Sequence, residues 1–120
     1  MGDCYLARLE GELSAADAAH ILKKAAGIPR ILLGGPLTVT AEAAEVFADG
    51  GICLLGNEGQ SVGPENAPMA VHKILLCKNI ALLEGIVLKS IPEGRYFLSA
   101  APLNLAGSDG SPCRAYLIGQ

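Results

Sequence analysis

The sequence lacks tryptophan, has only two histidines and 4% aromatic residues, and contains no apolar run of the roughly 18 residues that a membrane-crossing helix needs. The N-terminus opens with Gly2 and Asp3 and lacks the basic and then apolar pattern of a signal peptide. Nine basic residues are scattered along a chain of net charge −3, so no basic patch favours nucleic acid or an anionic membrane. We therefore expect a soluble, cytoplasmic protein that binds neither nucleic acid nor membrane.

A C-x-x-C pair is also missing, which removes the usual signature of a structural zinc or thiol redox site. The four cysteines, Cys4, Cys53, Cys77 and Cys113, stand far apart, and three of them lie inside apolar runs. A disulfide framework is unexpected in a cytoplasmic protein. We therefore predict buried, reduced thiols that behave as small hydrophobic residues.

What the sequence does contain is small apolar side chains. Hydrophobic residues make up 51% of the 120 residues, and the mean hydropathy is +0.40. This length corresponds to one domain, residues 1–120, with a single core. Because so apolar a chain has more surface to bury than a small globule can hide, we expect a homo-oligomer.

Strand and helix signals alternate through the first half of the chain. Ser14, with Asp17 three residues later, predicts the start of a helix that ends near residue 26, and Thr40 predicts a second helix over 41–48. Apolar runs at 4–9, 30–33 and 52–55 predict strands, the last buried on both faces. This alternation indicates an α/β layer built from crossover units.

The second half has a different pattern. A helix is predicted around residues 69–77, and strands are predicted at 80–84, 95–101 and 114–118. Because no long helix separates these three strands, we expect them to pair antiparallel and to make the sheet mixed. Residues 107–112 are predicted to form a hairpin connection.

Two residues of the second half are candidate metal ligands. His72 lies near the start of the apolar helix, and Glu84 lies in an apolar run whose other side chains are nonpolar. A carboxylate buried there needs a partner or a metal ion. A surface-facing strand end explains Glu84 equally well, and a hydrogen-bonded histidine at the end of a helix explains His72 without a metal. The other histidine, His20, is expected to be an ordinary helix residue.

The polar loop 56–68 follows directly on an apolar strand, the position at which α/β folds bind ligands. It lacks the glycine spacing of a phosphate-binding loop. Ser61 has no obvious base beside it and no G-x-S-x-G turn around it, so a Ser-His-Asp hydrolase is not indicated. A plain connecting loop remains the alternative.

Several segments together resemble the C-terminal half of the cyclase or kynurenine formamidase-like family of metal-dependent hydrolases. The resemblance covers about residues 40–118 well and the first 40 loosely. In order along the chain, the matching segments are GGICLLG (50–56), QSV (60–62), AVHKILL (70–76), LLEG (82–85), IPEGRY (91–96), APL (101–103) and GSDGSPCRA (107–115).

The resemblance implies an α/β fold of the swivelling β/β/α type with a mixed sheet, a homo-oligomeric assembly, and hydrolysis of an amide or related bond in a small-molecule substrate by water activated on zinc or manganese. It implies metal ligation by His72 and Glu84. It also places Glu58 and Ser61 in the loop where ligand or substrate is bound.

The chain departs from this family in one respect. The family's main metal motif, H-x-G-T-H-x-D-x-P-x-H, belongs to its N-terminal half and does not occur here, so the chain resembles a short form without it. Met1 and the first strand favour a naturally short chain. Two hypotheses follow: a second chain supplies the missing motif and completes a hydrolase, or the protein is a non-catalytic, oligomeric remnant with a structural or ligand-binding role.

Overall fold

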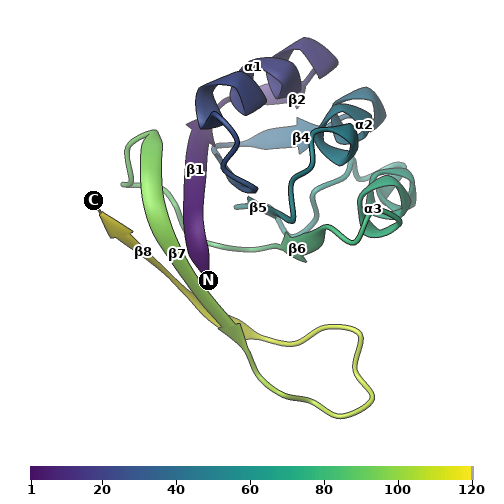
Figure 1. Ribbon diagram of the computed structural model, residues 1–120. Helices are drawn as coiled ribbons and strands as arrows, with labels where there is room; N and C mark the ends of the chain where they lie inside the picture. Colours follow the sequence, from purple (N-terminus) through teal and green to yellow (C-terminus); the bar gives the residue numbers. More distant parts are fainter. Residues whose placement is uncertain (120) are drawn as a thin grey trace.

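The computed structural model describes residues 1–119 of the chain. Strands and helices follow one another in the order β1 (Gly2–Arg8), β2 (Gly11–Leu13), α1 (Ala15–Ala25), β3 (Arg30–Gly34), β4 (Leu37–Val39), α2 (Ala41–Asp49), β5 (Leu54–Asn57), α3 (Pro68–Leu76), β6 (Ala81–Leu83), β7 (Gly94–Pro102) and β8 (Cys113–Gly119). Six of the strands form one sheet in the order β6-β5-β3-β1-β7-β8 (Figure 1). β2 and β4 form a separate parallel pair.

The sheet is mixed, as the sequence predicts. The strands from β6 to β1 run parallel, whereas β7 pairs antiparallel with β1, and β8 pairs antiparallel with β7. The α/β class with a mixed sheet is therefore confirmed. Within residues 1–119 no helix is long and apolar enough to cross a membrane.

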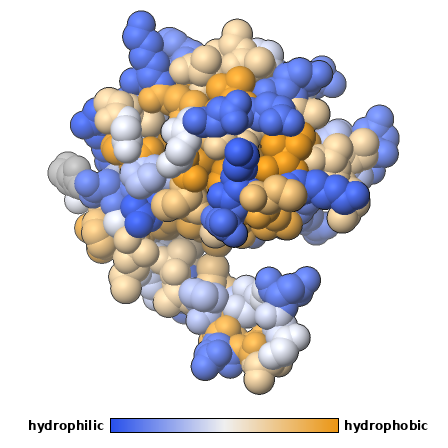
Figure 2. Space-filling view, turned by 45° about the vertical axis from the view of Figure 1, so that its right-hand side comes forward, coloured by the Kyte–Doolittle hydropathy of each residue, from blue (hydrophilic) through white to orange (hydrophobic). Residues whose placement is uncertain are grey.

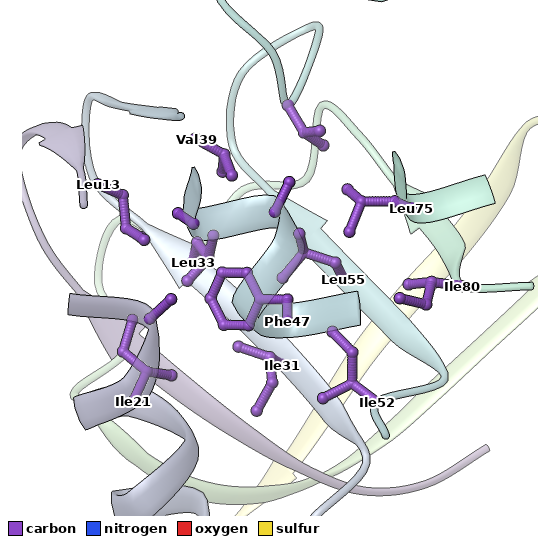
Figure 3. Packing of buried hydrophobic residues seen from close by; sticks show 14 of the residues in the cluster. Leu13, Ile21, Ile31, Leu33, Val39, Phe47, Ile52, Leu55, Leu75 and Ile80 are labelled. Atoms are coloured by element: carbon purple, nitrogen blue, oxygen red, sulfur yellow. The ribbon is translucent and has the colours of Figure 1, made fainter. Parts of the chain in front are cut away.

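Alternation along the strands divides the apolar side chains between the two faces of the sheet. Tyr5 and Ala7 of β1 belong to the larger core, which the three helices cover, while Cys4 and Leu6 face the other way. Phe47 of α2 lies at the centre of the larger core, among side chains from α1 and the parallel strands (Figure 3). The helices therefore protect one face of the sheet.

Both predicted helix starts are confirmed. The Ser14 hydroxyl accepts a hydrogen bond from the Asp17 amide, and the Asp17 carboxylate accepts one from the Ser14 amide, which completes a capping box. The Thr40 side chain caps α2 in the same way through the Ala43 amide.

The prediction for the strand after α3 is wrong in one respect. β6 does not pair with β7; it pairs parallel with β5 at the opposite edge of the sheet. The short helix α3 is the crossover that returns the chain from β5 to β6, so β6 completes a parallel unit. Antiparallel pairing is confirmed for β7 and β8, and the connection between them spans residues 103–112, longer than the predicted 107–112.

Two further predictions need correction. The third strand lies at Leu54–Asn57 and not at 52–55, because the turn after α2 extends through Cys53, whose amide donates to the Pro29 carbonyl at 2.7 Å. Of the four free thiols, Cys4 alone is buried, and burial raises its pKa to about 11. Cys53 and Cys77 are exposed because they occupy chain turns at the ends of helices, where apolar neighbours do not enclose them.

Candidate functional site

The candidate site lies at the carboxyl ends of two neighbouring parallel strands. Gly56 of β5 pairs with Leu83 of β6, so the residues that follow each strand emerge at the same edge of the sheet. Glu84 comes directly after β6, and His72 lies on α3, the helix that joins the two strands. This edge is where parallel α/β sheets bind ligands.

His72 and Glu84 are in direct contact. The Nε2 atom of His72 lies 3.0 Å from Oε1 of Glu84, and the two side chains are 21% and 30% exposed. The same Glu84 oxygen accepts a hydrogen bond of 3.0 Å from the Val62 amide. Both residues were candidates from the sequence, and the structure brings them into contact at the carboxyl ends of β5 and β6.

A backbone carbonyl group fixes the orientation of the His72 ring on the side opposite Glu84. Its Nδ1 atom lies 2.7 Å from the Pro68 carbonyl oxygen, one helical turn earlier. Because a carbonyl oxygen can only accept, Nδ1 carries the proton, and in the neutral ring Nε2 presents a lone pair. That lone pair faces a carboxylate oxygen, an arrangement that a proton or a metal cation between the two atoms makes favourable.

Glu58 follows β5 and has a clear structural task. Its Oε2 atom accepts a hydrogen bond of 2.7 Å from the Gly35 amide, and its Oε1 atom accepts one of 2.7 Å from the Leu88 amide. Burial alone raises the pKa of this carboxyl group, but the two amides and the nearby Arg8 and Lys89 outweigh burial and hold the pKa below its ordinary value. Glu58 thus ties the turn after β3 to segment 84–92.

Ser61 lies in the loop beside the His72–Glu84 pair. Its carbonyl oxygen accepts a hydrogen bond of 3.0 Å from the Asn57 side-chain amide. Within the described chain, the Ser61 hydroxyl oxygen and the Asn57 side-chain oxygen are buried without a hydrogen-bond partner. Asn57 is 1% exposed, and sequence reasoning missed it, although an asparagine at the end of an apolar strand was a visible signal.

The candidate site offers two side chains of the kinds that bind metal ions, His72 and Glu84. Among residues 1–119, no group of three or more histidine, cysteine, aspartate and glutamate side chains is arranged to hold a metal ion. Catalytic zinc takes about three protein ligands and a water molecule. His72 and Glu84 fit two of those positions. The other histidine, His20, lies exposed on α1.

Glu93 anchors the far end of segment 84–92, and sequence reasoning missed it. Its Oε1 atom accepts hydrogen bonds of 2.8 Å from both the Tyr5 hydroxyl and the Lys24 ammonium group, and its Oε2 atom accepts one of 3.0 Å from the Arg8 amide. Lys24, followed by the Arg8 amide and Tyr5, lowers the pKa of Glu93 to about 2, against the opposing effect of burial.

The lowered pKa predicts an acid-sensitive contribution to stability. The Glu93 carboxylate stabilises the fold above its ordinary pKa of 4.5, and this stabilisation is lost as the pH falls from 4.5 to about 2. Because the side chain is partly exposed, we expect Glu93→Gln to lower the free energy of unfolding by only about 1 kcal/mol at pH 7, and by much less at pH 2.5. Urea unfolding at both pH values measures this, with Glu45→Gln on the wet side of α2 as the control. A loss that does not depend on pH would contradict the assignment.

Known proteins resemble this chain in both sequence and structure, although no family model matches it. The kynurenine formamidase of Erythrobacter litoralis is 36% identical over 98% of this chain, and the kynurenine formamidase of Salinibacter ruber is 39% identical over 66% of it. A solved structure of a potential metal-dependent hydrolase with cyclase activity superposes with a TM-score of 0.83 at 28% identity over 97% of this chain. An isatin hydrolase shares the fold, with a TM-score of 0.78 at 18% identity.

The match covers only part of each relative. This chain spans 60% of the Erythrobacter litoralis protein, 38% of the Salinibacter ruber protein and 64% of the solved hydrolase. Relatives of this kind therefore contain a substantial additional part that has no counterpart in residues 1–120.

Proposed function

Because this chain belongs to the cyclase or kynurenine formamidase-like family, of whose members it spans a part, we propose that it contributes the His72–Glu84 half of a metal-dependent hydrolase site. One observation carries the proposal: Nε2 of His72 and Oε1 of Glu84 face each other at 3.0 Å. Two solved relatives bear names that describe metal-dependent hydrolases.

The residues behind the pair favour metal ligation over a simple ion pair. The Pro68 carbonyl holds the proton on Nδ1 of His72, which leaves Nε2 free to bind a metal, and hydrogen bonds of this kind orient metal-binding histidines in general. The Val62 amide fixes Glu84 in the same manner. Both side chains are thus held in place before any metal arrives.

We propose zinc or manganese as the metal and a small-molecule amide as the substrate. When bound, such a metal supplies Lewis acidity and lowers the pKa of a water molecule. His72 and Glu84 hold it at the sheet edge, and the loop with Glu58 and Ser61 forms the adjacent wall. Both oxygens of Glu58 are engaged by backbone amides, so its part in the site is to keep this wall in place. The names of the curated relatives favour an aryl formamide over other amides.

Two ligands leave the site incomplete, and we propose that a second polypeptide supplies the others. The part of the relatives that this chain does not match is the natural source. Assembly into homo-oligomers, which the apolar composition favours, is compatible with such a complex.

Metal content tests the proposal directly. We expect zinc or manganese to copurify with the protein, and the bound amount to fall by about tenfold or more in a His72→Ala, Glu84→Ala double variant, because both ligands are lost. Elemental mass spectrometry measures the metal. A His20→Ala variant is the matched control, since it removes the exposed histidine of α1 and should retain the metal. Folded, metal-free wild-type protein would instead favour the non-catalytic remnant.

A further inference from the structure

The two faces of the main sheet are covered very differently. The three helices pack on one face, whereas among residues 1–119 the other face is covered by segment 84–92 and by the curl of the β7–β8 hairpin (Figure 1). The hairpin extends beyond the body of the molecule, and its tip forms a separate lobe at the bottom of Figure 2. A hollow separates this lobe from the body.

Two cavities lie in this hollow, between the sheet and the hairpin. Their volumes are about 630 and 450 Å³, and they share part of their lining, including Leu82, Leu83 and Cys113. Large apolar side chains stand exposed along them: Val87 is 83% exposed, Leu103 60% and Leu105 49%. Together, the two cavities and these side chains form what we call the open face.

The open face is lined mainly by apolar side chains. Glu84 and Arg114 are the charged residues among those that line the larger cavity. Exposed apolar side chains gathered around hollows of this kind mark sites of interaction with another polypeptide or with a ligand. Occupation of the larger cavity alone would leave Leu103 and Leu105, which line the smaller cavity, still exposed.

The relatives indicate what covers this face. The solved hydrolase superposes over 97% of this chain, yet the match spans 64% of that protein, which leaves 36% (100 minus 64) to pack somewhere on the same fold. The helix-covered face of the parallel strands is already filled by α1, α2 and α3. Glu84 also lines the larger cavity, so a polypeptide bound there would reach the incomplete metal site.

We propose that the open face is the docking surface for a second polypeptide that corresponds to the unmatched part of the relatives. The inference rests on the proposed function in one respect, that this partner also supplies the remaining metal ligands. The open face indicates the chemistry of the partner. The partner's apolar side chains fill the two cavities, and its metal-ligating side chains lie beside Glu84. Residues 110–115, at the end of the hairpin connection and the start of β8, line the larger cavity and would contact the docked chain.

The cysteines of the chain provide a direct test. Cys113 lines both cavities, whereas the exposed Cys53 and Cys77 lie outside them. The probe is the 40% (100 minus 60) of the Erythrobacter litoralis relative that this chain does not match, joined to the full chain by a flexible linker. The linker keeps the probe at a high effective concentration. Each thiol is labelled with iodoacetamide in the presence of a chelator, and mass spectrometry measures the labelling rate at each cysteine.

We expect Cys113 to be labelled about tenfold or more slowly in the fusion than in the unfused chain, while the rates at Cys53 and Cys77 stay the same. Val87→Asp with Leu103→Asp should restore labelling of Cys113, because charges then enter the cavities. Met69→Asp is the matched control, since Met69 is 62% exposed on α3 and lines neither cavity.

Two outcomes overturn the proposal. One is a Cys113 that reacts equally fast in the fusion and in the unfused chain. The other is a Cys113 whose protection in the unfused chain increases with protein concentration, because a second copy then occupies the open face. Because a chelator is present, neither labelling rate of Cys113 depends on bound metal. The His72→Ala, Glu84→Ala variant of the fusion should therefore still protect Cys113 from labelling. Failure of the docking surface is thus distinguishable from failure of the metal site.

Discussion

Replacing Phe47 by alanine is expected to lower the free energy of unfolding by about 3–5 kcal/mol, the usual cost of deleting a fully buried aromatic ring. Phe47 is 0% exposed and stands between α2 and the parallel strands (Figure 3). Its neighbours come from both flanking helices and from β3 and β5, so they can close the resulting cavity only by moving several elements. Urea or thermal unfolding measures the loss.

The chain contains its own control for this substitution. Phe97 of β7 is the other phenylalanine and is only partly buried, on the strand that leads into the hairpin. Phe97→Ala removes the same atoms, and we expect a loss of about 1 kcal/mol. Equal losses at the two positions would mean that the helix-covered core does not dominate the stability of the fold.

Gly35→Ala is expected to destabilise the protein by about 3 kcal/mol or more, for two reasons that act together. Gly35 has a φ of +112°, which side-chain-bearing residues rarely adopt, and a Cβ atom there would lie 2.2 Å from the Leu9 carbonyl oxygen. The backbone must therefore shift. Because the Gly35 amide donates to Glu58, the same shift should loosen segment 84–92, and hydrogen exchange of the Leu88 amide should rise.

Gly27→Ala separates the two causes. Gly27 also has a positive φ, of +88°, but a Cβ atom there would meet nothing within 4 Å. We expect a cost of about 1 kcal/mol from backbone strain alone. If Gly35→Ala costs no more than Gly27→Ala, the contact with Leu9 is relieved without strain, and the turn after β3 is softer than the structure implies.

Local signals in the sequence predicted the elements that depend on near neighbours. Ser14 and Thr40 start their helices because each cap is formed with a residue three positions later. The apolar run at 4–9 likewise predicted a strand, and β1 forms there, at Gly2–Arg8. Such features need no knowledge of the rest of the fold.

Features that depend on distant partners were harder to predict. The pairing partner of β6 depends on whether β5 or β7 has an unpaired edge, and the residues of β6 themselves do not indicate which. Glu93 has its role only because Tyr5, Arg8 and Lys24 approach it from the far end of the sequence. The exposure of Cys53 likewise depends on where the turn after α2 ends. Apolar neighbours in the sequence did not determine what surrounds it.

The candidate site falls between these cases. His72 and Glu84 could be singled out because each is a polar residue in an apolar segment, but their contact depends on α3 returning the chain to β6 beside β5. Asn57 lies at the same edge, and its unpaired side-chain oxygen becomes visible only once the loop above it is folded.

The position of β1 in the sheet has a consequence for how the protein folds as it is synthesised. β1 contains the first residues of the chain, yet one of its partners, β7, comes near the other end: Gly2 pairs with Leu98 and Cys4 with Tyr96. On the ribosome, β1 can pair with β3 early, but its other edge stays open until β7 has emerged. The parallel, helix-covered half should therefore form first, with an unsatisfied strand edge that invites misassociation. Pairing of β7 with that edge is then the late step that commits the chain to its native sheet.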